Sequence, residues 1–264
     1  MAMILTLTQG TGQSDLTSVY ERALHAAANA MTLDAFYGRP PLQLPALVAN
    51  AFQQAVGSTN PLVRLDGLKY QNARAGRPPS QMAETLASAL QPLTEVPDPL
   101  VSGEALFLLK QYPMANRRLD GVDGITPQGY LEAGDRLLAI QALTAAQACY
   151  QRGYAMEPLP ALNQGLKRIQ EKRRLAEQRI NQGNAAYDVK NYPEALTFYG
   201  QAQMLYPDWD LPWIRVGDTQ FALKQQAAAL TAYEQAVKLN PDYLQGRPFK
   251  KRYDSLHKKV TPRV

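Results

Sequence analysis

The sequence contains very few of the residues that build disulfides, metal sites and common catalytic centres. Its 264 residues include one cysteine, Cys149, and two histidines, His25 and His257. One cysteine cannot form an intramolecular disulfide, and these three residues are too few for a structural zinc site. We therefore expect no metal and no cofactor, and the single cysteine fits a reducing compartment.

The sequence also lacks the features of a secretory signal at its start and the long apolar runs of membrane proteins. The first fifteen residues hold no lysine or arginine and only short apolar stretches, unlike a secretory signal. No run approaches the roughly 18 apolar residues of a membrane-spanning helix. The sequence predicts a cytoplasmic protein with no transmembrane segment.

Recognisable catalytic motifs are absent as well. The chain has no HExxH, GxSxG or GxxxxGK motif and no dinucleotide fingerprint. The segment "GVDGIT" at residues 121–126 is interpreted as a glycine-rich turn, since a calcium loop needs more oxygen ligands than Asp120 and Asp123 supply. We predict that the protein is not an enzyme; the alternative is a site without a known motif in residues 1–113.

What the sequence does contain is an internal repeat with a period of 34 residues. The windows that start at Ala176 and Asp210 align without a gap, and a third window starts at Pro127. The first two windows share four small or aromatic positions and a proline: Gly183 and Gly217, Ala195 and Ala229, Tyr199 and Tyr233, Ala202 and Ala236, Pro207 and Pro241. The third window matches with Gly134, Ala146, Tyr150, Gly153 and Pro158.

The shared positions indicate a pair of antiparallel helices in each window. Small residues at positions 8, 20 and 27 allow two helix backbones to approach closely, and the aromatic residue at position 24 fills the space beside them. The final proline ends the second helix, and polar turns such as "VKNYPE" separate the two. Each window therefore predicts a helix, a turn and a second helix.

This pattern resembles the tetratricopeptide repeat, a 34-residue helical hairpin. The best copy carries Trp213, Gly217, Tyr233 and Pro241 and departs from the family at Gln220. The resemblance implies an all-α fold, a right-handed α-solenoid of such hairpins, here with an N-terminal helical region. It also implies a non-enzymatic scaffold or adaptor that binds other proteins within an assembly.

The predicted organisation has three parts. Residues 1–113 form an N-terminal helical region of five helices. Residues 60–93 have the size of one helical hairpin, which fits either a decayed repeat or a hairpin unrelated to the repeats. Residues 114–126 form a linker loop, and residues 127–264 form the repeat domain. Fifteen extra residues between the first two copies predict one long helix over 161–187 that projects beyond the solenoid, and a basic helix over 247–262 caps the domain.

In proteins of this family, set positions of each first helix line a concave groove that holds a partner's peptide or helix. Carried over residue by residue, the resemblance predicts a partner-binding groove formed by Ile180, Asn181, Asn184, Tyr187, Asp188, Leu211, Ile214, Arg215, Asp218 and Phe221. The alternative is that the chain's own carboxyl-terminal helix covers part of this surface.

The charge of the chain is concentrated near its end. The formal net charge is +5, and the last segment contains the basic patch Lys250, Lys251, Arg252, Lys258 and Lys259. Tyr253, Leu256 and Val260 share one helical face, which favours a capping helix with its lysines in water. The alternative function is attraction of nucleic acid or an anionic membrane to these charges.

Overall fold

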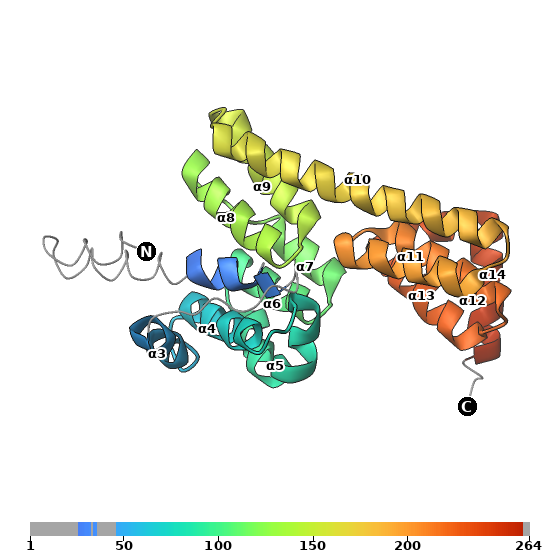
Figure 1. Ribbon diagram of the computed structural model, residues 1–264, viewed down its shortest axis with the longest axis horizontal. Helices are drawn as coiled ribbons and strands as arrows, with labels where there is room; N and C mark the ends of the chain where they lie inside the picture. The colour runs from blue at the N-terminus through green and yellow to red at the C-terminus, as the bar shows by residue number, and fades with distance from the viewer. Residues whose placement is uncertain (1–25, 33, 36–45, 261–264) are drawn as a thin grey trace, which may run out of the picture. The chain divides into compact units, whose positions relative to one another are not determined.

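The computed structural model describes residues 26–32, 34–35 and 46–260, and all regular structure in these ranges is helical. The all-α fold predicted from the sequence is therefore confirmed. Residue contacts divide the chain into two compact units. Unit 1 is Met1–Ile140 with Ala148–Glu157, and unit 2 is Gln141–Gln147 with Pro158–Val264. Figure 1 shows the helices coloured along the chain.

Unit 1 consists of short helices, two of which begin at caps that the sequence predicts. After a helical segment at residues 26–32 come α3 (Ala46–Ala55), α4 (Pro61–Arg74), α5 (Met82–Leu90), α6 (Pro99–Leu108), α7 (Tyr112–Leu119), α8 (Pro127–Ala139) and the second half of α9 (Leu143–Met156). Asn60 caps α4 and Asp98 caps α6, each accepting two backbone N–H bonds, with proline next in the chain. The first predicted helix begins outside the described residues.

The predicted linker loop is wrong over its first half, because residues 114–119 belong to α7. Glycine and turn formers begin only at Asp120, and the sequence there does form a turn. The Asp123 carboxylate accepts hydrogen bonds from the backbone N–H of Ile125 at 2.9 Å and from the Tyr130 hydroxyl at 3.1 Å. Arg152 donates to the carbonyl oxygens of Asp120 and Val122. The turn is thus tied into unit 1.

Unit 2 contains α10 (Pro160–Asp188), α11 (Tyr192–Leu205), α12 (Asp210–Ala222), α13 (Gln226–Leu239) and α14 (Arg247–Val260) (Figure 1). The long helix lies where the sequence places it, and its inserted part, which the sequence predicts to project beyond the solenoid, is not wholly exposed to solvent. Leu162 and Ile169 are buried, and the Lys172 ammonium group donates to Gln141 Oε1 at 2.8 Å. The insertion therefore has a buried side as well as a solvated one.

The helical hairpins share one packing contact between a glycine and a tyrosine sixteen positions later. A Cβ atom added to Gly183 or Gly217 would lie 2.4 or 2.5 Å from the ring of Tyr199 or Tyr233, and Gly134 meets Tyr150 at 2.4 Å. Each tyrosine hydroxyl donates to the residue after the glycine, at 2.9 Å to Asn184, 2.8 Å to Asp218 and 2.7 Å to Asp135. The same contact thus recurs in each of the three sequence windows.

A hairpin in unit 1 that the sequence alignment missed repeats much of this geometry. Gly103 of α6 faces Leu119 of α7, also sixteen positions later, and a Cβ atom added to Gly103 would lie 2.4 Å from Leu119 Cδ2. Between the two helices, Lys110 has a φ of +62°, the value found at the corresponding turn residues Lys190 and Lys224. The pattern was hidden because a leucine replaces the tyrosine and α7 is short.

The end of unit 2 is closed by α14, which packs on α13. Leu256 is buried with Ile214, Ala229, Leu230, Tyr233 and Ala236, and the apolar side of α14 supplies further contacts from Phe249, Tyr253 and Val260. The predicted carboxyl-terminal helix thus lies against the last hairpin. Its residues beyond Val260 are outside the described ranges.

Candidate partner-binding groove

A hollow of about 430 Å³ lies among the helices of unit 2 and unites five of the predicted groove residues with two others. We call it the groove, and it is lined by Asn184, Tyr187, Asp188, Tyr199, Arg215, Asp218 and Arg252. These residues come from α10, α11, α12 and α14. Sequence reasoning missed Tyr199 and Arg252. Tyr199 was readable as the repeated tyrosine, whereas no repeat position identifies Arg252.

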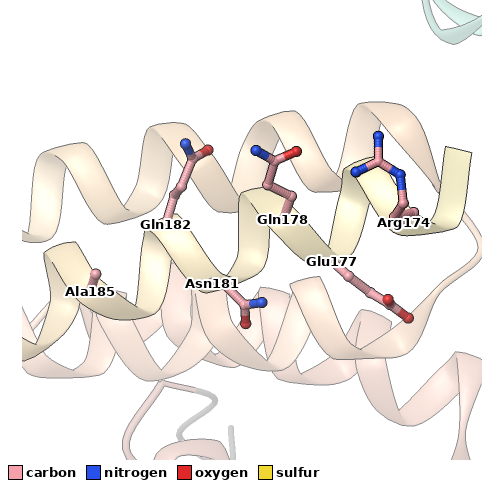
Figure 2. Close-up of a pocket in the computed structure, with 6 residues that line it drawn as sticks. All are labelled: Arg174, Glu177, Gln178, Asn181, Gln182 and Ala185. Atoms are coloured by element: carbon pink, nitrogen blue, oxygen red, sulfur yellow. The ribbon is translucent and has the colours of Figure 1, made fainter. Parts of the chain in front are cut away.

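A second, more open hollow of about 530 Å³ runs along α10 and contains another predicted groove residue, Asn181. Figure 2 shows the six residues that line it, all from α10: Arg174, Glu177, Gln178, Asn181, Gln182 and Ala185. The side chains are mostly polar amides and charges, so this surface offers hydrogen bonds rather than apolar contacts. The predicted residues of α10 are therefore divided between two hollows.

Two of the predicted groove residues are in the protein interior instead. Ile180 is 4% exposed and Ile214 is 9% exposed, and Ile214 belongs to the core beneath α14. Positions carried over from a family predict the side of a helix but not how far a neighbouring helix covers it. Leu211 is half-buried outside both hollows, while Phe221 remains 41% exposed.

The charged groups of the groove are arranged around Asp218. Its carboxylate accepts a hydrogen bond from the Tyr233 hydroxyl at 2.8 Å and one from Arg252 Nη1 at 2.6 Å. Arg215 Nη1 lies 4.0 Å from the other carboxylate oxygen. Burial, together with the negative charge of Asp218, raises the pKa of Tyr187, so this tyrosine keeps its proton at neutral pH.

Arg252 is the basic-patch residue that the structure separates from the others. Its guanidinium enters the groove, and its Cζ atom lies 5.3 Å from the centroid of the Phe221 ring. The remaining lysines of the patch, Lys250, Lys251, Lys258 and Lys259, are exposed on α14. The alternative was that the carboxyl-terminal helix covers part of the groove. Arg252 is the one residue of α14 that lines the groove, and its contacts agree with this alternative.

Unit 1 contains a very different charged cluster, which is buried. Glu104 accepts hydrogen bonds from Arg136 Nε at 2.6 Å and from the Lys69 ammonium group at 3.2 Å, while Arg136 also bonds to Asp66. Burial alone would raise the pKa of Glu104, but the charges of Arg136 and Lys69 outweigh it and lower this pKa. Burial lowers the pKa of Lys69 to about 8. The cluster holds α4, α6 and α8 together.

Two of the remaining chemical candidates, Cys149 and His257, have structural roles. Cys149 is 1% exposed, as expected for a small buried residue, and burial raises the pKa of its thiol to about 11, which keeps it protonated and unreactive. His25 lies outside the described residues. His257 lies 3.4 Å from Glu234 on the packed side of α14. Neither Cys149 nor His257 lines the groove.

Successive helical hairpins, each closed by the same glycine–tyrosine contact between its two helices, define the class of α-helical repeat proteins. Residues 212–243 match the family model of the tetratricopeptide repeat, and the chain therefore carries a repeat of this family. A search of curated proteins finds no match to the chain. In the part of the chain that the structure describes, no helix has the length and apolar character to cross a membrane.

Proposed function

We propose that the protein is a non-enzymatic adaptor that binds a segment of another protein in the groove of unit 2. The observation that carries this proposal is the groove itself, where helices from successive hairpins bring polar and aromatic side chains to one accessible hollow. Its volume lies within the range of about 300–1,000 Å³ that is usual for binding pockets. Tetratricopeptide repeats generally mediate protein–protein interaction, which supports the same function.

The regular hairpin contacts support three repeats, of which the family match covers the last. Because the glycine–tyrosine contact and the hydroxyl bond recur at the same spacing in all three sequence windows, we assign the windows from Pro127 and Ala176 to the same family. We also propose α6–α7 as a shortened hairpin of the same type. Repetition of one hairpin is what gives a solenoid its continuous concave surface.

A second function is binding of the basic patch to nucleic acid or to an anionic membrane. The contacts of α14 support this function less well than they support a capping role for the helix. The Phe249 ring lies 5.1 Å from Tyr233 and 6.1 Å from Tyr253, so these aromatic rings are engaged inside unit 2. They are not free to stack on bases, and the apolar face of α14 is not free to enter a membrane. Only the exposed lysine charges remain for such partners.

Site-specific crosslinking in the native host would test the adaptor function. A photoreactive amino acid is placed at Tyr187 or Asp188 of the groove, and as controls at Met204 or Lys238, which are exposed residues of unit 2 that line neither hollow. We expect one discrete protein adduct from the groove positions only. Equal adducts at the control positions, or none at the groove positions, would contradict the proposal.

The crosslinked partner, once identified and purified, allows a direct affinity measurement. Asp188→Arg changes the charge of the groove, and Asp254→Arg makes the same change on the exposed side of α14. We expect Asp188→Arg to change the dissociation constant by about tenfold, or about 1.4 kcal/mol, with Asp254→Arg near wild type. Equal effects of both variants would assign binding to general electrostatics instead of the groove.

A further inference from the structure

The guanidinium of Arg252 is held by three groups of different chemistry. Its Nη1 atom lies 2.6 Å from the Asp218 carboxylate and 3.2 Å from the Tyr233 hydroxyl, and its Cζ atom stacks 5.3 Å from the Phe221 ring centroid. A carboxylate, a hydroxyl acceptor and an aromatic face together recognise a planar cation better than a point charge. We call Asp218, Phe221 and Tyr233 the arginine socket.

The socket is built by α12 and α13 and does not depend on the arginine that fills it. Tyr233 is buried against Gly217, and its hydroxyl bond holds the Asp218 carboxylate in place. Phe221 lies on the same helix as Asp218, three residues later. Removal of the Arg252 side chain therefore leaves the three socket groups attached to the same hairpin.

Arg252 can leave the socket without release of α14. Its side chain is 41% exposed and the carboxylate it meets is 22% exposed, so the ion pair is accessible to water and to competing cations. Besides the bond from Arg252 to Tyr233, α14 is held to the last hairpin by apolar contacts of the buried Leu256 and of Phe249 and Val260, which remain when Arg252 leaves. The occupant of the socket is thus exchangeable while the fold is retained.

The charges of the groove also favour a cation when Arg252 is absent. Asp188 and Asp218 supply two negative charges, and Arg215 supplies one positive charge. Without Arg252 the lining has a net charge of −1, and with Arg252 it is neutral. A side chain that replaces Arg252 must therefore be positively charged to restore the balance.

We propose that the groove recognises an arginine side chain of its partner segment and that Arg252 occupies the same socket until the partner displaces it. This inference rests on the proposed adaptor function and specifies the partner as a segment with an accessible arginine. While Arg252 occupies the socket it competes with the partner's arginine. The apparent affinity for the partner is therefore lowered, because only molecules with an open socket bind it.

The socket can be tested without the partner. The full chain, labelled with ¹⁵N, is titrated with N-acetyl-arginine methylamide, and with the citrulline analogue as a neutral control of the same shape. We expect saturable shifts of the Asp218 and Phe221 amides in Arg252→Ala, with binding at least about fivefold tighter than in wild type. Lys258→Ala, which also removes one exposed charge from α14, should behave as wild type.

Three outcomes would overturn the proposal: Arg252→Ala responds equally to arginine and citrulline, wild type binds arginine as tightly as Arg252→Ala, or binding survives in Arg252→Ala/Asp218→Asn. Thermal unfolding of each variant confirms that it is folded before titration. Failure here with successful crosslinking at Asp188 would leave the adaptor function with a partner of different chemistry. Arginine binding without any crosslinked partner would contradict the adaptor function alone.

Discussion

The two units use the same position of the helical hairpin in opposite ways. Glu104 in unit 1 and Asp218 in unit 2 each directly follow the glycine that packs against the second helix, and each has an arginine 2.6 Å away. The side chain of Glu104 is fully buried and that of Asp218 is 22% exposed. The same acid–arginine pair is therefore a fixed internal connection in unit 1 and a solvent-accessible ion pair in unit 2.

The difference arises from what covers the first helix of each hairpin. In unit 1, α4 brings Asp66 and Lys69 to the cluster around Glu104, so water is excluded on all sides. In unit 2 the corresponding position faces the groove, and only Arg252 reaches it from α14. We infer that partner binding belongs to unit 2, while unit 1 uses the same surface for its own stability.

The largest expected effect comes from breaking the buried cluster. Glu104→Gln leaves Lys69 and Arg136 without a full negative partner in the interior, which should lower the free energy of unfolding by about 3–5 kcal/mol. Circular dichroism during urea unfolding measures the loss. Glu84→Gln, at an exposed carboxylate that pairs with Lys110, should cost less than about 1 kcal/mol. A similar small cost at Glu104 would show that the buried cluster is not essential.

Two buried acids, Asp208 in unit 2 and Glu104 in unit 1, should make the stability of their units depend on pH with opposite signs. Burial raises the pKa of Asp208 in unit 2 to about 6, although its carboxylate accepts a bond from the Thr144 N–H. The folded state therefore holds this proton more tightly than the unfolded state, and Asp208 makes unit 2 lose stability as pH rises from about 4 to about 6. Glu104, with its lowered pKa, makes unit 1 lose stability as pH falls.

Asp208→Asn removes the charge and should stabilise unit 2 at pH 7 by about 2 kcal/mol, with its slope between about pH 4 and 6 removed. Both tryptophans, Trp209 and Trp213, are in unit 2, so their fluorescence reports this unit separately. Urea unfolding of wild type and variant at several pH values gives the comparison. Parallel pH curves for the two proteins would show that Asp208 ionises normally.

The glycine–tyrosine contact provides a test of the hairpin packing in unit 2. Gly217→Ala places a methyl group 2.5 Å from the Tyr233 ring, and the resulting overpacking should cost about 1–2 kcal/mol after the helix preference for alanine is subtracted. Gly200→Ala, on α11 where the added Cβ would meet no atom of a neighbouring side chain or helix within 4 Å, should instead stabilise by up to about 1 kcal/mol. Tryptophan fluorescence during thermal unfolding measures both, and equal signs would contradict the packing argument.

The smallest effect on stability is expected at Arg252, in the exposed acid–arginine pair of unit 2. Arg252→Ala should lower the stability of unit 2 by less than about 1 kcal/mol, because its ion pair with Asp218 is open to solvent. Its Tm should differ little from that of Lys258→Ala. A loss as large as that of Glu104→Gln would mean that Arg252 is a structural residue and does not exchange with a partner.

Much of the fold was predictable because it depends on local spacing. The positions of Gly183, Tyr199, Gly217 and Tyr233 predicted two hairpins, and Asn60 and Asp98 predicted helix starts, since a cap or a close helix contact requires particular side chains. The α6–α7 hairpin escaped because Leu119 stands where the other hairpins have tyrosine. The candidate site was only half predictable, because exposure is set by neighbouring helices.

The sequence by itself determined the helical hairpins and the long helix α10, because these follow from periodicity, glycine and proline. The side of each first helix on which a groove is expected came from the resemblance to the repeat family. Only the tertiary structure decided which of those side chains are accessible. Ile180 and Ile214 became core, Glu104 became a buried ion-pair centre, and Arg252 reached the groove from a distant part of the chain. Burial and long-range charge pairing depend on which helices pack together, and local spacing does not encode that.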